Sequence, residues 1–77
     1  MRMTIDVWNE LPFMVRNKLT IYGKKLNSTK DPQTVACVGF NLLGYMEALQ
    51  DAGLIEDDTE ATLLRKYVLS IGKEEQA

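Results

Sequence analysis

Residues 32–46 read PQTVACVGFNLLGYM, fifteen residues without a charged side chain, and the fold prediction starts from them. At 100° per residue, the apolar side chains of this region form one helical stripe: Val35, Val38, Leu42, Tyr45, Met46, Leu49 and Ala52. Further apolar side chains lie on the opposite side, at Ala36, Phe40 and Leu43. A helix that is apolar nearly all round is normally buried. Because a 77-residue chain has few other elements to surround it, we expect a second copy of the chain or a partner protein to cover part of it.

Capping signals place this helix at residues 32–52. Asp31 is an N-cap acceptor and is followed by Pro32, which suits the first helical position because its missing N–H has no partner there. Gly53 fits the left-handed C′ position of a Schellman motif, in which Leu54 folds back on Leu49. Inside the helix, Gly39 and Gly44, together with Ala36 and Ala48, are small enough to admit another helix backbone.

The next helix is expected at residues 58–71. Asp57 and Glu60 have capping-box spacing. The apolar side chains that follow share one face, formed by Ala61, Leu63, Leu64, Tyr67, Val68 and Ile71, while Arg65 and Lys66 face solvent. Gly72 is expected to stop the helix and to leave residues 73–77 as a frayed tail. The short connection to the preceding helix predicts an antiparallel helical hairpin.

The N-terminal part predicts an arm over residues 1–9 and a helix over residues 10–27. Asn9 is a suitable N-cap with Pro12 in the first turn, and the apolar arc of the helix is Leu11, Val15, Leu19, Tyr22 and Leu26. Residues 2–8 alternate polar and apolar, which favours an extended arm or a leading helical turn and leaves open a strand paired across a dimer interface. The expected fold is a single all-α domain over residues 1–77: an oligomeric three-helix bundle with a C-terminal antiparallel hairpin and a short extended N-terminal arm.

Composition excludes several kinds of chemistry. The chain has one cysteine, Cys37, and no histidine, so a disulfide within the chain and a zinc site built from Cys and His are both excluded. Cys37 is interpreted as a small core residue. The acidic cluster formed by Asp51, Glu56, Asp57, Asp58 and Glu60 fits helix capping better than metal binding. We therefore expect no enzyme activity, no metal and no cofactor.

Charge is distributed unevenly along the chain. The net charge is −2, but residues 1–30 carry six basic and two acidic side chains, a balance of +4, and residues 31–77 carry three basic and nine acidic ones, a balance of −6. This polarity can orient self-association, attract a polyelectrolyte, or reflect ion pairs between helices. The sequence shows neither a secretory signal nor a stretch able to span a membrane, so we expect a cytoplasmic protein without a membrane partner.

Two partial resemblances bear on function. The segment from Thr34 into Ala-Gly-Leu-Ile-Glu resembles the recognition helix and exit of winged-helix regulators, which implies a strand at residues 62–71 and DNA binding. That helix carries only Glu47 and Asp51 as charged groups, which disfavours DNA because phosphate attraction supplies most nonspecific affinity. The leucines, glycine turn and acidic cap of residues 49–64 are similar to SHOCT-type helical hairpin domains, a pattern that capping physics also produces in unrelated hairpins.

The function expected from the sequence is protein contact without catalysis. We expect a homo-oligomeric regulator or inhibitor that covers a surface of an unidentified protein, as phage and mobile-element proteins do by analogy. The alternative is a small winged-helix or helical DNA-binding transcriptional regulator. The residues expected at the self or partner interface are Phe13, Met14, Ile21, Lys24, Lys25, Ala36, Phe40, Leu43 and Gly44.

Overall fold

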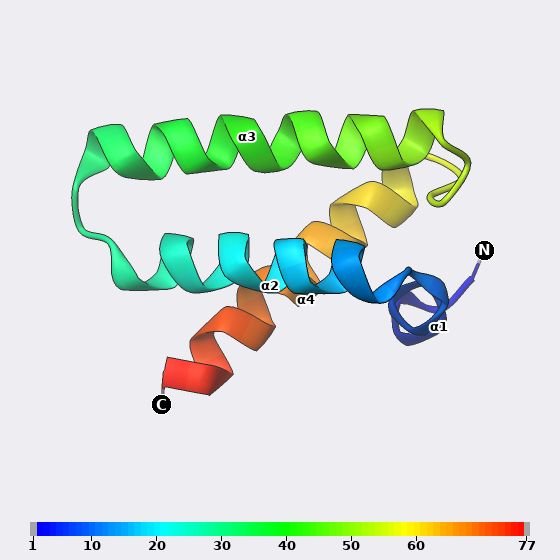
Figure 1. Cartoon of the computed structure of the whole chain (residues 1–77), viewed down its shortest axis with the longest axis horizontal. Coiled ribbons are helices and arrows are strands. Elements are labelled where there is room, and N and C mark those ends of the chain that lie inside the picture. The colour runs from blue at the N-terminus through cyan, green and yellow to red at the C-terminus, as the bar shows by residue number, and fades with distance from the viewer. Residues whose placement is uncertain (1, 77) are drawn as a thin grey trace.

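The computed structural model describes the backbone of residues 2–76 and the side chains of residues 2–73. All regular secondary structure in the described chain is helical, which confirms the all-α prediction, and the described residues form four helices: α1 (Thr4–Glu10), α2 (Phe13–Ser28), α3 (Pro32–Asp51) and α4 (Asp58–Gln76). Figure 1 shows α2 and α3 side by side in opposite directions, with α4 running obliquely across α2. α1 lies at the end of α2 where the chain enters it and packs against α4.

The N-terminal residues form a short helix, so the predicted extended arm over residues 1–9 is wrong where the structure describes it. Val7 and Leu11 are buried, and Trp8 packs its ring edge-on against Tyr67 with centroids 5.4 Å apart. Val7 and Leu11 follow a spacing of four residues, which outweighs the alternation because a lone strand would leave its backbone unpaired. Met1 lies outside the described residues.

The predicted helix over residues 10–27 is divided in two at Leu11 and Pro12. Both residues have extended backbones, with ψ of 141° and 149°, and Pro12 rather than Asn9 precedes the first turn of α2. A proline disfavours helical geometry in the residue before it. The apolar spacing continues through the break, which is why a single helix was expected.

The predicted capping of α3 is confirmed at both ends. The Asp31 carboxylate accepts the backbone N–H of Thr34 at 3.3 Å and its hydroxyl at 2.7 Å, and Pro32 opens the helix. These bonds, the side-chain one foremost, lower the pKa of the Asp31 carboxyl. At the other end Gly53 has φ +80°, and the N–H of Leu54 reaches the Leu49 carbonyl at 2.9 Å, which forms the Schellman motif.

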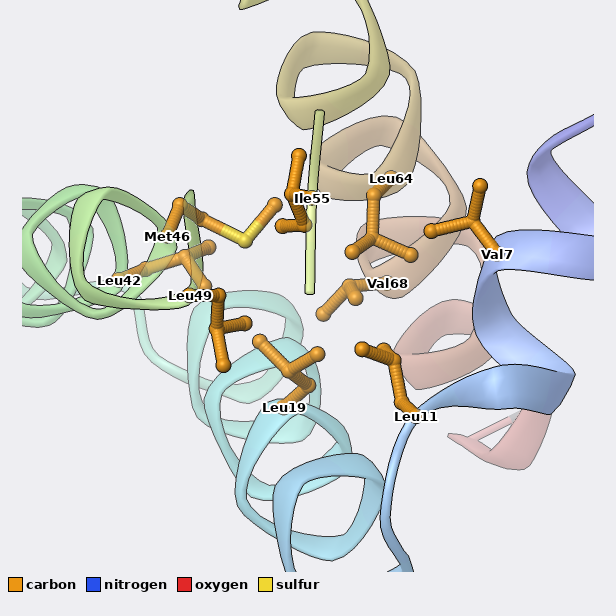
Figure 2. Packing of buried hydrophobic residues seen from close by; sticks show 9 residues of the cluster. All are labelled: Val7, Leu11, Leu19, Leu42, Met46, Leu49, Ile55, Leu64 and Val68. Atoms are coloured by element: carbon orange, nitrogen blue, oxygen red, sulfur yellow. The ribbon is translucent and has the colours of Figure 1, made fainter. Parts of the chain in front are cut away.

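One apolar core gathers residues from all four helices and the α3–α4 turn. Figure 2 shows nine buried side chains converging: Val7, Leu11, Leu19, Leu42, Met46, Leu49, Ile55, Leu64 and Val68. Only the second half of α3 contributes to this cluster. The first half is largely exposed, and Cys37 is exposed with it, so the interpretation of Cys37 as a core residue is wrong.

The tightest contact in the fold is the crossing of α2 and α4 at two glycines. A Cβ built on Gly23 would overlap the Val68 carbonyl, and one on Gly72 would overlap the backbone of Gly23. The Asn27 amide donates to Gly23 O within α2 at 2.8 Å and, across the crossing, to Leu69 O at 2.9 Å. Gly72 is therefore a packing residue inside α4, and the predicted stop at residue 71 with a frayed tail over 73–77 is wrong through Gln76; Ala77 lies outside the described residues.

This crossing also replaces the predicted C-terminal hairpin. α4 packs most extensively against α2 and touches α3 only sparsely, so the antiparallel neighbours are α2 and α3, linked by the rings of Tyr22 and Tyr45 at 5.9 Å. Because α4 turns away from α3 after the Schellman turn, the first half of α3 has α2 beside it but no close neighbour in α4 (Figure 1).

Candidate apolar interaction groove

The divergence of α3 and α4 leaves an apolar groove of about 480 Å³ beside the first half of α3. α3 supplies most of its wall, α4 supplies the facing side, and α2 supplies one leucine; the lining residues are Leu26, Ala36, Gly39, Phe40, Leu42, Leu43, Arg65 and Leu69. Phe40 stands out from this wall, with 73% of its surface exposed. An exposed phenylalanine beside an open apolar groove is typical of a contact surface rather than of a monomer's solvated face.

The groove offers little chemistry beyond apolar contact. Among the described residues, Arg65 is the one charged residue that lines it, and Arg65 is half-buried rather than fully solvent-facing as expected from the sequence. A small-molecule site usually adds several convergent polar groups to its apolar walls, and a catalytic site needs a nucleophile or an acid–base pair. Cys37 lies outside the groove lining. Within the described residues the groove is therefore an apolar surface with Arg65 at its side.

Two glycines of α3 are required neither by a close contact nor by a turn within the described chain. A Cβ built on Gly39 or Gly44 would meet no atom within 4 Å, and neither residue has a positive φ. Glycine inside a helix costs about 1 kcal/mol relative to alanine. By contrast, Gly23 and Gly72 admit a neighbouring backbone and Gly53 forms a turn. Space for a partner's backbone would account for the two glycines that the fold itself does not use.

The structure distributes the predicted interface residues over two helices. Ala36, Phe40 and Leu43 line the groove, and Gly44 is exposed on the same helix outside the groove lining. The remaining residues are exposed on α2 and do not line the groove: Phe13, Met14, Ile21, Lys24 and Lys25. The expected interface is thus two separate surfaces, one on α3 and one on α2.

The sequence-based prediction missed the groove residues contributed by the other helices. Leu26 was assigned to the core, Leu69 to no site and Arg65 to solvent. Their roles depend on the angle at which α4 crosses α2, and no local signal in the sequence specifies that angle. Gly39, on α3 itself, was also absent from the predicted interface residues, although its interior helical position already suggested close approach of another backbone.

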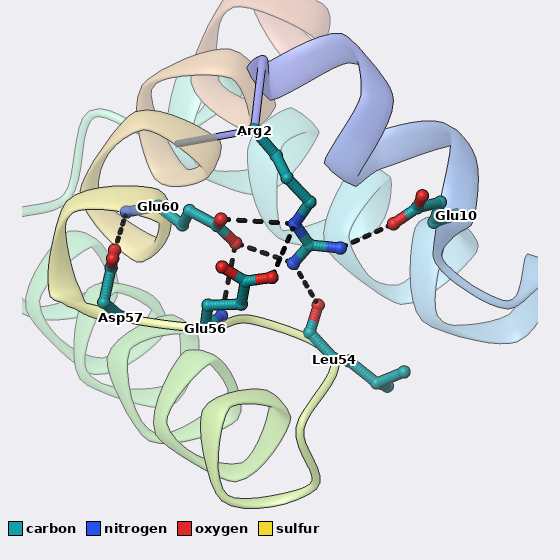
Figure 3. A network of polar contacts seen from close by, with 6 residues as sticks. All are labelled: Arg2, Glu10, Leu54, Glu56, Asp57 and Glu60. Atoms are coloured by element: carbon teal, nitrogen blue, oxygen red, sulfur yellow. Dashed lines mark hydrogen bonds and ion pairs between the residues drawn. The ribbon is translucent and has the colours of Figure 1, made fainter.

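A polar cluster at the opposite end of the fold ties the N-terminus to α4 (Figure 3). The Arg2 guanidinium donates to the Glu60 carboxylate at 2.8 and 3.2 Å, to Glu10 at 2.5 Å and to the Leu54 carbonyl at 3.4 Å. It also lies 3.4 Å from Glu56. Among the three possible origins of the uneven charge distribution, ion pairing between distant segments holds for Arg2.

Glu60 is the buried member of this cluster, with 2% of its surface exposed. Its N–H donates to the Asp57 carboxylate at 2.9 Å, which is the first half of the predicted capping box. In the second half, the Glu60 carboxylate accepts the N–H of Glu56 at 3.2 Å instead of the N–H of Asp57. The hydrogen bonds from Arg2 lower the pKa of the Glu60 carboxyl against the opposing effect of burial. The Glu60 carboxylate thus accepts two hydrogen bonds from Arg2 and one from the Glu56 N–H, and these bonds hold the segment around Arg2 against the start of α4.

The winged-helix alternative implied a strand at residues 62–71, but these residues belong to helix α4. None of the described helices is long and apolar enough to cross a bilayer. Comparisons of the chain with protein-family models, with curated proteins and with solved structures find no match.

Proposed function

We propose that this protein is a non-catalytic interaction module that self-associates and acts as a regulator or inhibitor by binding another protein. The observation that carries the proposal is the apolar groove together with Phe40, which lies beside it with 73% of its surface exposed. A small chain gains little by leaving a large aromatic side chain in water next to an open apolar wall. Binding of another polypeptide at this surface would remove Phe40 and the groove from water.

The α2 surface supports a second contact. Phe13 and Met14 are 71% and 73% exposed, and α2 carries Arg16, Lys18, Lys24 and Lys25 without an acidic residue. Apolar anchors with a charged rim are the usual composition of a protein interface. This basic surface is the one that would meet an acidic protein partner, while the groove side serves self-association.

The test combines solution mass with partner capture. Light scattering or sedimentation at increasing concentration should give a mass above 8.7 kDa, and tagged protein should retain a specific partner from host lysate. A chain that stays monomeric at high micromolar concentration and captures nothing would contradict the proposal. Retention on heparin at low salt would instead favour nucleic-acid binding through α2.

A further inference from the structure

We propose that the groove-side face of α3 pairs with the same face of a second copy of the chain, antiparallel, about a two-fold axis between Phe40 and Leu43. The inference rests on the proposed function and names the partner of its groove. α3 carries two seams: the core stripe, and a second series of exposed residues spaced by three and four positions, Gln33, Ala36, Phe40, Leu43 and Glu47. That spacing is the one by which helices pack along a shared seam.

The centre of the second seam is built for close approach. Phe40 and Leu43 are its large side chains, at 73% and 41% exposure, and Gly39 and Gly44 flank them with open space where a Cβ would be. An axis between Phe40 and Leu43 sets the Phe40 ring of each copy against Leu43 of the other, next to those glycines. The same chain already uses paired glycines for its tight α2–α4 crossing.

Charge at the two ends of α3 selects both the occupant and its direction. Lys30 precedes the helix, Glu47 and Asp51 lie near its end, and residues 32–46 between them carry no charge. Antiparallel pairing places Lys30 of each copy within about one turn of Asp51 of the other, and it opposes the two helix dipoles. Parallel pairing would place Glu47 beside Glu47. The face therefore complements itself in one orientation.

The length of α3 suits such a pairing. Its 20 residues extend about 30 Å, close to the 34 Å long axis of the molecule. A stable dimer buries about 800 Å² on each partner, roughly a sixth of the 5050 Å² that this chain exposes. The α3 face is continued by the α4 wall of the groove at Leu69 and Arg65, which adds to the apolar surface that a second copy could cover.

The orientation is tested by cysteine cross-linking in a Cys37→Ser background. The axis places Ala36 of one copy opposite Glu47 of the other, so an equimolar mixture of Ala36→Cys and Glu47→Cys proteins should form a mixed disulfide under mild oxidation. Two Ala36→Cys residues would lie roughly 16 Å apart along the axis, so homodisulfides should form slowly. Cross-linking of Ala36→Cys to itself in preference to the mixture would overturn the antiparallel arrangement.

A matched pair of substitutions tests the face itself. Phe40→Glu should weaken dimerisation at least about tenfold, whereas Phe13→Glu, at a residue of equal exposure on α2, should leave it unchanged; circular dichroism checks that both variants fold. A dimer that tolerates Phe40→Glu would refute the α3 pairing and leave self-association standing. A monomeric parent that retains another protein through Phe40 would refute the second copy as occupant and keep the interaction module. A monomeric parent that retains no other protein would refute both the α3 pairing and the proposed interaction module.

Discussion

Replacing Gly23 by alanine should push α2 and α4 apart. The added Cβ would overlap Val68 O and approach Val68 Cγ1 to 3.2 Å, so the clash is with backbone and cannot be relieved by a side-chain rotation alone. Gly23 lies near the middle of α2, away from the frayable ends, so local unwinding offers no escape. Asn27, which bonds across the same crossing, would be displaced as well.

Two opposing effects set the magnitude. Alanine favours the helix by about 1 kcal/mol over glycine, and over-packing a tight core contact costs about 1–3 kcal/mol. Because the added Cβ overlaps backbone atoms and the Asn27 hydrogen bonds would lengthen, we place the cost of the clash at the upper end of that range. The free energy of unfolding should therefore fall by about 2 kcal/mol. For a domain of this size such a loss lowers Tm by roughly 10 °C.

The assay is urea and thermal denaturation followed by circular dichroism, at a concentration where the chain is monomeric. Gly44→Ala is the matched control, because its Cβ meets nothing within 4 Å, and it should raise the free energy of unfolding by about 0.5–1 kcal/mol. A Gly23→Ala protein as stable as the parent, or stabilised as much as Gly44→Ala, would refute the glycine crossing.

Three further predictions test the core, the polar cluster and the α2 surface. Leu42→Ala should cost about 2–5 kcal/mol of unfolding free energy, since Leu42 is 1% exposed; an unchanged denaturation midpoint would exclude it from the core. Because the folded pKa of Glu60 is lowered, its contribution to stability is present at neutral pH and should be lost as pH falls below about 5; Glu60→Gln should flatten that part of the Tm-against-pH curve, and a curve identical to the parent's would contradict the ion pair. Charge reversal at Lys24 and Lys25 should impair partner capture with helicity intact, and capture equal to the parent's would move the partner site elsewhere.

Local signals explain why α3 could be bounded from sequence. Asp31 and Pro32 act within one turn of the helix start, and Gly53 acts within one turn of its end. The exposed apolar side of α3 was also predictable, because Phe40 lies opposite the core stripe whatever packs on that stripe. These features depend on neighbours in the chain.

The features that the sequence did not predict depend on distant residues. Gly72 was predicted to stop its helix, and no local signal linked it to Gly23, which lies 49 residues away in the chain but in contact with it in the fold. Arg2 and Glu60 are 58 residues apart, so a buried carboxylate looked like an ordinary capping residue. Pro12 did carry a local signal for the break before α2, but the continuous apolar spacing from Leu11 onwards outweighed it.

The α2–α4 crossing has a consequence for folding kinetics. α2 ends at Ser28 and its main packing partner, α4, begins at Asp58, so the largest helix–helix contact closes a loop of twenty-nine residues that contains α3. Loop closure must precede the energy gained from such contacts, which slows folding relative to bundles whose sequence neighbours pack. We expect α3 to form its helix early, because its caps are local. The docking of α2 on α4 through Gly23 and Gly72 should then be the slow step of folding.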